Sequence, residues 1–326
     1  MLRRQFTGGL IALMASQPRL NAQGKSIRVG MLWHAASEEE ERMYLSEFRR
    51  GMADLGYVEG KNLILDNRFP AERPELFNKY AAELAALKPD VLVTISPLSA
   101  TAAQHATRTL PVVFTIVPDP VRAKLVESLA RPGGNMTGLS TLLVDLIPKR
   151  MQILKQMLPS LSRAALLFNP RDPKYARDQI DEFRAAAHAL NFEVEAFEVT
   201  APEKLDDAFS QIANGTFGAA VSVADSMFTI ERFKIAKLAL KAKLPFMGHN
   251  AEMVSAGSLL SYGPNFRAIL YRAAYYVDKI VKGAKPAELP VEQPSKLELI
   301  INTKTAKALG INVPLHLQQI ADDIVE

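Results

Sequence analysis

Residues 255–314 read SAGSLLSYGPNFRAILYRAAYYVDKIVKGAKPAELPVEQPSKLELIINTKTAKALGINVP. A glycine-started apolar strand runs into a Tyr-Gly-Pro-Asn turn and then into a helix with a strong apolar face. A proline-rich extended connector follows, and after it come one more apolar strand and a short helix that ends at Gly310. Each strand–helix piece is too small to be a domain, so each must join a sheet that is built elsewhere in the chain. The stretch therefore predicts a chain that crosses between two lobes.

Before this stretch, the sequence alternates short apolar runs with longer amphipathic runs, in two series of similar size. The apolar runs are continuous, which is typical of strands buried on both faces of a parallel sheet. In the first series we expect strands at 27–33, 63–69, 91–95 and 112–117, with helices at 38–55, 74–87 and 99–107. In the second we expect strands at 164–168, 192–199, 219–223 and 244–247, with helices at 147–157, 174–190, 202–213 and 229–242.

A segment that contains three prolines and a glycine pair, residues 118–144, separates the two series and is the best candidate for a domain boundary. We predict an α/β fold of two doubly wound, Rossmann-like lobes joined by a multi-strand hinge. Lobe one would comprise residues 24–143 plus 250–287, and lobe two residues 144–249 plus 288–326. The strand and helix after Gly257 would complete lobe one, and the chain would then cross to complete lobe two. A ligand would bind between the lobes and close them.

The N-terminus has the order of a bacterial export signal: Arg3-Arg4, a short apolar run, and small residues near Ala22. We predict a signal peptide over residues 1–23, either of the ordinary secretory type or of the twin-arginine type. Without its three arginines the chain's basic residues fall from 39 to 36 against 35 acidic ones, so charge gives no support for nucleic-acid binding. The chain has no cysteine, which excludes disulfides, thiolate metal sites and a lipid-anchored cysteine. We expect a soluble, exported, periplasmic protein.

Polar and aromatic residues follow several of the predicted strands, at the sheet edge where open parallel sheets bind ligands. Ser96 to Thr101 open a helix, and hydroxyls with free N–H groups there suit a carboxylate, unless Ser96 or Ser99 only caps the helix. Aspartates end strands in opposite lobes and could hold an ammonium group from both sides. The candidate ligand-binding residues on this reasoning are Trp33, His34, Ser96, Pro97, Leu98, Ser99, Asp119, Asp225, Asn250 and Tyr262.

Each candidate also has a structural interpretation. Trp33 and Tyr262 would form an aromatic platform in a cleft or pack in a core, and Asp119 between two prolines would make a turn. His34 and His249 end strands in different lobes, but no clustered ligand motif accompanies them. The chain also lacks the dinucleotide, P-loop, nucleophile-elbow and zinc-protease motifs. We therefore predict no catalytic residue, no metal and no cofactor.

Several stretches resemble the substrate-binding proteins of ABC transporters of the tryptophan/tyrosine-binding type, which have a periplasmic-binding-protein type I fold. The matching stretches are 56–62, 111–114 with Asp119-Pro120, 131–138, 260–263, 282–286 with 289–294, and 302–310. The resemblance implies ligand contacts on loops that match Ser96–Ser99, Val117–Asp119, Asp225 and Asn250. It also implies capture of a small polar or aromatic solute, an amino acid or a carboxylate, and its delivery to an inner-membrane permease. We expect a monomer.

Two other functions stay open at this point. One is a periplasmic enzyme on the same two-lobed scaffold, which would need an acid–base pair such as Asp119 with His34. The other is a ligand-sensing partner of a membrane receptor, which would use the same binding site.

Overall fold

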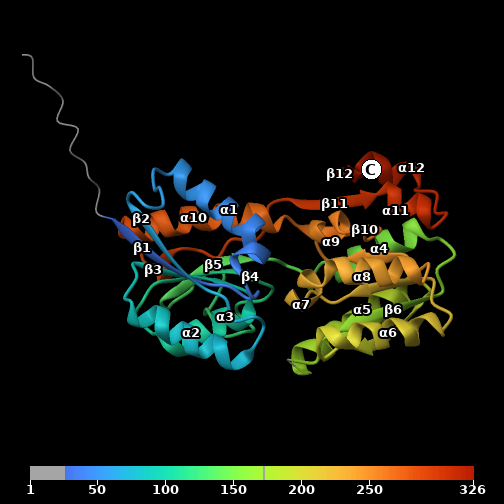
Figure 1. Ribbon diagram of the computed structural model, residues 1–326, viewed down its shortest axis with the longest axis horizontal. Helices are drawn as coiled ribbons and strands as arrows, with labels where there is room; N and C mark the ends of the chain where they lie inside the picture. Colours follow the sequence, from blue (N-terminus) through green and yellow to red (C-terminus); the bar gives the residue numbers. More distant parts are fainter. Residues whose placement is uncertain (1–25, 172) are drawn as a thin grey trace, which may run out of the picture.

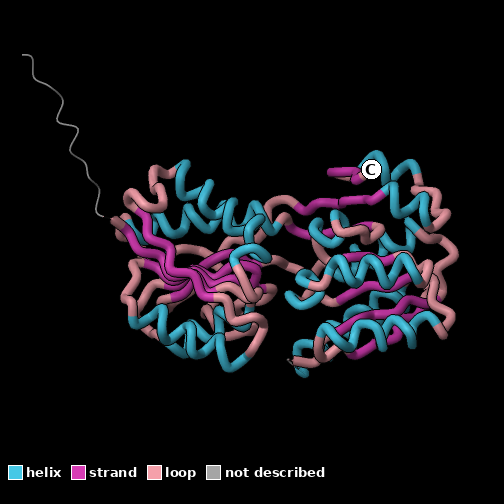
Figure 2. The backbone as a smooth tube through the Cα atoms, viewed as in Figure 1, coloured by secondary structure: helices cyan, strands magenta, loops and turns pink. Residues whose placement is uncertain are grey.

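The computed structural model describes residues 26–171 and 173–326. The predicted signal peptide, residues 1–23, lies outside the described residues. The chain forms two α/β lobes that lie side by side along the long axis of the molecule (Figure 1). Each lobe has its own sheet with helices around it (Figure 2). The predicted α/β class and two-lobed arrangement are confirmed.

Lobe one contains a five-stranded parallel sheet in the order β2-β1-β3-β4-β5. The order reverses between β1 and β3, as in a doubly wound sheet, because successive crossovers place helices on both faces. Its strands are β1 (Ile27–Leu32), β2 (Leu63–Arg68), β3 (Val91–Ile95), β4 (Val112–Val117) and β5 (Met136–Ser140). Its helices are α1 (Glu38–Asp54), α2 (Pro74–Ala86) and α3 (Pro97–Ala106).

Lobe two contains a seven-stranded sheet in the order β12-β11-β10-β9-β8-β6-β7, parallel except for the pairing of β10 with β11. Its strands are β6 (Arg163–Phe168), β7 (Glu193–Glu198), β8 (Ala219–Ser222), β9 (Phe246–Gly248), β10 (Leu260–Pro264), β11 (Leu297–Asn302) and β12 (Asp323–Val325). Its helices are α4 (Ile147–Met157), α5 (Pro173–Ala189), α6 (Leu205–Ala213), α7 (Ser226–Ile230), α8 (Arg232–Lys241), α9 (Ala251–Ser255), α11 (Thr303–Ala308) and α12 (Leu315–Ile320).

Residues 255–314 are divided between the two lobes differently from the prediction. Strand β10 was expected in lobe one, but it pairs with β9 and β11 in the sheet of lobe two. The short helix α9 links β9 to β10, so β10 is the next parallel strand of the same winding. Only the following helix, α10 (Phe266–Val281), reaches lobe one, where it packs beside α1 (Figure 1). The chain therefore crosses between β10 and α10.

Helices α1 and α10 approach closely because α1 carries Gly51 at their contact. A Cβ atom at Gly51 would lie 2.5 Å from the Tyr271 carbonyl oxygen, well inside van der Waals contact. Beyond α10, the chain forms the 3₁₀ turn Pro286–Glu288 and runs along lobe one, where Glu292 N–H donates to the Gly138 carbonyl at 3.0 Å. It then returns to lobe two as β11. The crossing segments form the connection between the lobes.

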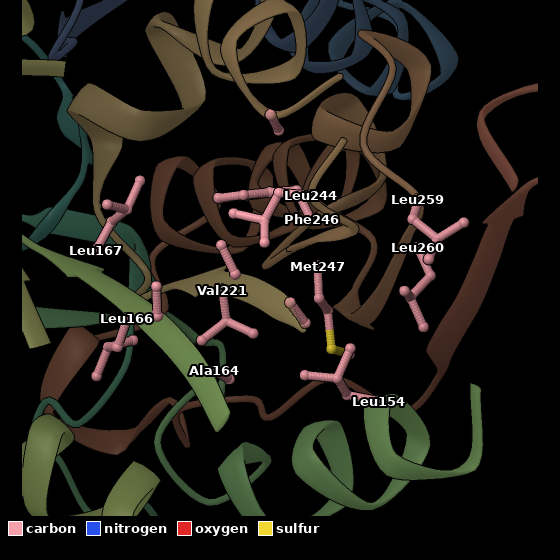
Figure 3. Packing of buried hydrophobic residues seen from close by; sticks show 14 of the residues in the cluster. Leu154, Ala164, Leu166, Leu167, Val221, Leu244, Phe246, Met247, Leu259 and Leu260 are labelled. Atoms are coloured by element: carbon pink, nitrogen blue, oxygen red, sulfur yellow. The ribbon is translucent and has the colours of Figure 1, made fainter. Parts of the chain in front are cut away.

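Buried apolar residues form one cluster in lobe two and two in lobe one, one on each face of its sheet. Figure 3 shows the lobe-two cluster, in which side chains from the central strands meet those of the covering helices. The labelled residues are Leu154, Ala164, Leu166, Leu167, Val221, Leu244, Phe246, Met247, Leu259 and Leu260. Across the two described ranges, no helix has both the length and the apolar character that a bilayer span requires.

Candidate functional site

A cavity of about 380 Å³ lies between the two lobes, and we call it the main cavity. Its walls come from the carboxyl ends of strands and the loops that follow them in both lobes, the position expected for open parallel sheets. Lobe one and α10 contribute His34, Tyr44, Ser96, Pro97, Leu98, Thr101, Ile116, Val117, Pro118, Asp119, Arg122, Ala123 and Phe266. Lobe two and its connection contribute Leu143, Asn169, Arg171, Gln179, Val223, Ala224, Asp225, Ser226, Thr229 and His249.

The N-terminus of α3 opens onto the main cavity. Ser96 caps this helix, since its Oγ accepts from the Ser99 N–H at 3.2 Å and its carbonyl accepts from the Ala100 N–H at 3.1 Å. The backbone φ of Ser96 is 129°, a conformation that side-chain-bearing residues rarely adopt. Pro97 has no N–H, so Leu98 supplies the open donor of the first turn. Ser99 is fully buried, donates to the Ser96 carbonyl, and does not line the cavity.

Strand β4 bends as it reaches the main cavity. Its pairing with β5 shifts register between Phe114 and Val117, and Ile116 adopts a left-handed φ of 56°. The bend is possible because Gly138 of β5 has no Cβ to collide with the Phe114 carbonyl. As a result, Ile116 and Val117 both line the cavity.

Asp119 lies just beyond β4, on an exposed loop. Its Oδ1 accepts from the Arg122 N–H at 2.9 Å, which is the turn-making role considered from the sequence. It still lines the main cavity, at its outer part. Asp225 faces it from lobe two but is more enclosed. Asp225 caps α7 through the Met227 N–H at 2.9 Å, and Asn169 Nδ2 donates to it at 3.4 Å.

Sequence reasoning missed Glu72, which enters the interlobe space from lobe one. Ala71 and Glu72 both have left-handed φ values, 53° and 58°, and their N–H groups donate to the Ala35 and His34 carbonyls. This strained loop holds the Glu72 carboxylate beside His34, Arg171 and Ser226. The available signal was a charged, proline-flanked segment at the end of β2, the strand end that was not considered.

His34 lies between two carboxylates. Its Nε2 is 3.3 Å from Glu41 Oε1, and its Nδ1 is 3.3 Å from Glu72 Oε1. Burial alone lowers the pKa of His34, but Glu41, Glu72 and Asp225 outweigh it and raise the pKa to about 9. The imidazole is therefore charged at neutral pH.

The carboxylates around His34 have shifted pKa values of their own. Burial raises the pKa of Glu72, but the hydrogen bond and charge of His34 outweigh it and hold it below the usual range. Burial, followed by the charge of Glu72, raises the pKa of Asp225. Asp225 therefore places a carboxyl group in the cavity wall, while Glu72, from the opposite lobe, lies close to it and is paired with His34 and Arg171.

Ion pairs join the lobes around the main cavity. Glu72 of lobe one pairs with Arg171 of lobe two, and Arg122 of lobe one pairs with Asp178 on α5. A third contact links Arg267 of α10 to Glu252 of α9 at 3.4 Å. These pairs can form only when the lobes are close together, so the structure represents a closed cleft.

Besides Ser99, three sequence-predicted site residues do not line the main cavity. Trp33 is fully buried in the core of lobe one, where its ring stacks on Phe69 with centroids 6.2 Å apart. Asn250 is buried and caps α9 by accepting from the Met253 N–H. Tyr262 packs against the core of lobe two. Trp33 and Tyr262 therefore pack in or against the cores, which is the alternative to a place in the cleft that the sequence left open.

His249 lines the main cavity from lobe two as a neutral group. Its Nε2 is 2.9 Å from Thr229 Oγ1, and its Nδ1 is 3.3 Å from Ser222 Oγ. Burial and the charge of nearby Arg150 lower the pKa of His249 to about 3. Among the described residues, no group of three or more His, Asp or Glu side chains has a metal-binding arrangement.

Residues 38–325 match the family model described as ABC transporter substrate binding protein. A tyrosine-binding protein of Clostridioides difficile (strain R20291) is 28% identical over 264 residues, which cover 81% of this chain and 75% of that protein.

Solved structures with the same fold include two that superimpose over most of the chain. The ABC domain in complex with L-Trp from Streptococcus pneumonia superimposes with a TM-score of 0.83 at 23% identity, over 92% of this chain and all of that one. A conserved domain protein from Vibrio cholerae gives the same TM-score at 27% identity, with the same coverage of both chains.

Proposed function

The chain belongs to the family of ABC transporter substrate-binding proteins, and we propose that it captures a zwitterionic α-amino acid in the main cavity and delivers it to a membrane permease. The observation that carries this choice of solute is the charge arrangement of the cavity. It has helix N–H and hydroxyl groups from α3 at one wall and the enclosed carboxyl group of Asp225 at another, and Glu72, paired with His34 and Arg171, lies close to Asp225.

The solute carboxylate would bind at the start of α3. The Leu98 N–H is the open donor there, and Ser96 and Thr101 line the same wall. A helix N-terminus favours negative charge because its N–H groups are unpaired and the peptide dipoles sum there. The strained backbone of Ser96 supports this role, since strain persists where function needs a fixed geometry.

The solute ammonium would bind beside Asp225, with Glu72 as the second carboxylate. This pairing replaces the predicted pairing of Asp225 with Asp119, because Asp119 is exposed and its carboxylate caps a turn. Asp225 and Glu72 come from different lobes, and their mutual repulsion contributes to the raised pKa of Asp225. Arg171 already offsets part of that repulsion, and a solute ammonium beside Asp225 would offset more of it and favour closure of the lobes.

The side chain of the solute would lie against the apolar part of the cavity. Leu98, Ile116, Val117, Val223 and Phe266 line it. An apolar or aromatic side chain suits these walls. The relatives described as tyrosine-binding and as a complex with L-Trp support testing aromatic amino acids first.

We also propose that the protein works in the periplasm as a monomer, after export on its N-terminal signal. Family membership supports export, and the Arg3-Arg4 sequence with its apolar run supports a cleaved signal. The enzyme alternative gains no support from the site, since His34 is paired with Glu41 and Glu72 rather than with Asp119.

A thermal-shift screen of the twenty amino acids, followed by calorimetric titration, tests the proposal. We expect micromolar or tighter binding of one or a few amino acids and at least 10-fold weaker binding of the matching deaminated acids, roughly the value of one charge-assisted contact. Asp225→Asn should weaken amino-acid binding by roughly 30-fold or more but leave the deaminated acid unaffected. Equal binding of the acid and the amino acid, or no shift with any amino acid, would refute it.

A further inference from the structure

A second cavity of about 220 Å³ opens beside the main cavity, at the seam between the lobes. It shares His34, Tyr44 and Thr229 with the main cavity, so these three residues separate the two spaces. The rest of its wall belongs to it alone and comes from α1 in lobe one and from the α7–α9 region in lobe two. These residues are Ala35, Glu40, Glu41, Met43, Ile230, Arg232, Phe233 and Glu252.

Two buried carboxylates lie in this wall, and an oxygen of one of them, Glu41 Oε2, has no hydrogen-bond partner. Glu41 is 1% exposed, and its Oε1 accepts from the Ala35 N–H while its Oε2 has no hydrogen-bond partner. Glu252 is 4% exposed and faces Arg267 at 3.4 Å. Burial raises the pKa of both glutamates because His34 and the nearby arginines do not compensate for the lost hydration. The buried Tyr44 hydroxyl, in the same wall, also has no partner.

The remaining wall is apolar and open at its rim. Met43, Ile230 and Phe233 line it, and Phe233 is 64% exposed, which is unusual for a large apolar side chain. Arg232 is already engaged, since its guanidinium donates to the Thr229 carbonyl at 2.9 Å and lies 4.7 Å from the Phe233 ring centre. The cavity thus combines an unpartnered, buried Glu41 oxygen and an unpartnered Tyr44 hydroxyl with an apolar surface.

We propose that the second cavity binds an organic cation, a primary amine on an apolar stem, and that this cation strengthens solute binding in the main cavity. The ammonium would bind between Glu41 and Glu252, within reach of the Tyr44 hydroxyl, and the stem would contact Met43, Ile230 and Phe233. The amine-binding step stands by itself, whereas the coupling step rests on the proposed solute-binding function.

Amine binding and solute binding are coupled because the walls of the second cavity come from both lobes. Glu41 belongs to lobe one and Glu252 to lobe two, so an amine between them can make both contacts only when the cleft is closed. A ligand that prefers the closed form shifts the protein toward it. By linkage, the solute must then strengthen amine binding by the same factor.

The test uses n-pentylamine as the probe, titrated calorimetrically into the mature protein. Glu252→Gln and Phe233→Ala leave the lining of the main cavity unchanged, and Phe233→Ala also keeps the ion pair between Arg267 and Glu252, which Glu252→Gln removes. Glu39→Gln is the control, since Glu39 lies on the same helix as Glu41 but pairs with Arg42 on the surface. We expect Glu252→Gln to weaken pentylamine binding by at least 10-fold, roughly one charge-assisted contact, and Glu39→Gln to leave it unchanged. Because Phe233 is exposed, Phe233→Ala should fold normally and weaken pentylamine binding as well.

The second titration repeats the first in the presence of a saturating amino acid. Pentylamine should then bind more tightly, by about fivefold or more. Competition between the two ligands, binding that Glu252→Gln does not change, or no pentylamine binding would overturn the proposal. If no amino acid binds at all, the proposed function fails, while the pentylamine titration of the wild type and Glu252→Gln still decides the second cavity.

Discussion

His34 gives the clearest quantitative prediction, because its charge depends on neighbours that exist only in the folded protein. Its pKa is about 9 in the folded state against 6.5 in the unfolded chain. A difference of that size corresponds to on the order of 3 kcal/mol of stability. Because the folded-state pKa is the higher one, this stabilisation is complete below pH 6.5 and is lost as the pH rises through about 9.

The perturbation is His34→Gln, which removes the titrating group and keeps a hydrogen-bonding side chain. Between pH 6.5 and 9, the free energy of unfolding of the wild type should fall by on the order of 3 kcal/mol more than that of the variant. The carboxylates that produce the effect are Glu41, Glu72 and Asp225. His105→Gln is the matched control, because His105 lies exposed on α3.

The assay is urea unfolding at several pH values, with an NMR titration of the His34 imidazole in the folded protein. A parallel loss of stability in the wild type and His34→Gln would refute the account of this cluster. A His34 imidazole that titrates near pH 6.5 would also refute it, because Glu41, Glu72 and Asp225 would then not raise the pKa of His34.

Three further predictions concern other parts of the molecule. Asp178→Asn removes the ion pair with Arg122 across the cleft, and Asp178 itself does not line the cavity. The variant should weaken solute binding by at most about fivefold, and by less at high salt, whereas Asp181→Asn on the same helix should leave binding unchanged. A loss of affinity that does not depend on salt would contradict this prediction. The pKa of His249 lies near 3, below its unfolded value, so the protein should lose stability as the pH falls from 6.5 toward 3. In acid unfolding curves, His249→Asn should reduce that loss of unfolding free energy by roughly 4 kcal/mol. The same loss in the variant and the wild type would argue against a neutral buried imidazole. Gly51→Ala should destabilise the protein by about 1–3 kcal/mol in urea unfolding, because the added Cβ collides with the Tyr271 carbonyl. Gly134→Ala, which has open space around it, should leave stability unchanged. Equal effects of the two variants would show that α1 and α10 do not pack this closely.

Much of the fold was predictable because its strands are buried on both faces and therefore read as continuous apolar runs. The assignment of β10 to a lobe was not, since an apolar strand of five residues pairs equally well in either sheet. What decides it is the five-residue helix α9, which is too short to give a periodic signal and connects β9 directly to β10. The helix α10 then crosses to lobe one because its apolar face, with Gly51 opposite, fits α1.

The candidate site was predictable where a strand end alone defines it and not where side-chain direction or loop conformation matters. Trp33 and His34 are neighbours at the end of β1, and because side chains alternate along a strand, Trp33 enters the core while His34 lines the cavity. Glu72 reaches the site only through two successive left-handed residues, which nothing in a single sequence reveals. Arg171 lines the main cavity and pairs with Glu72 across the cleft, which depends on the position of Glu72.

A crystal structure of the mature protein with a bound aromatic α-amino acid tests the central claim most directly. The account predicts one amino acid between the lobes, its carboxylate on the Leu98 N–H and its ammonium within hydrogen-bond distance of Asp225. An amino acid bound outside the main cavity, or bound there with its ammonium far from both Asp225 and Glu72, would contradict the account.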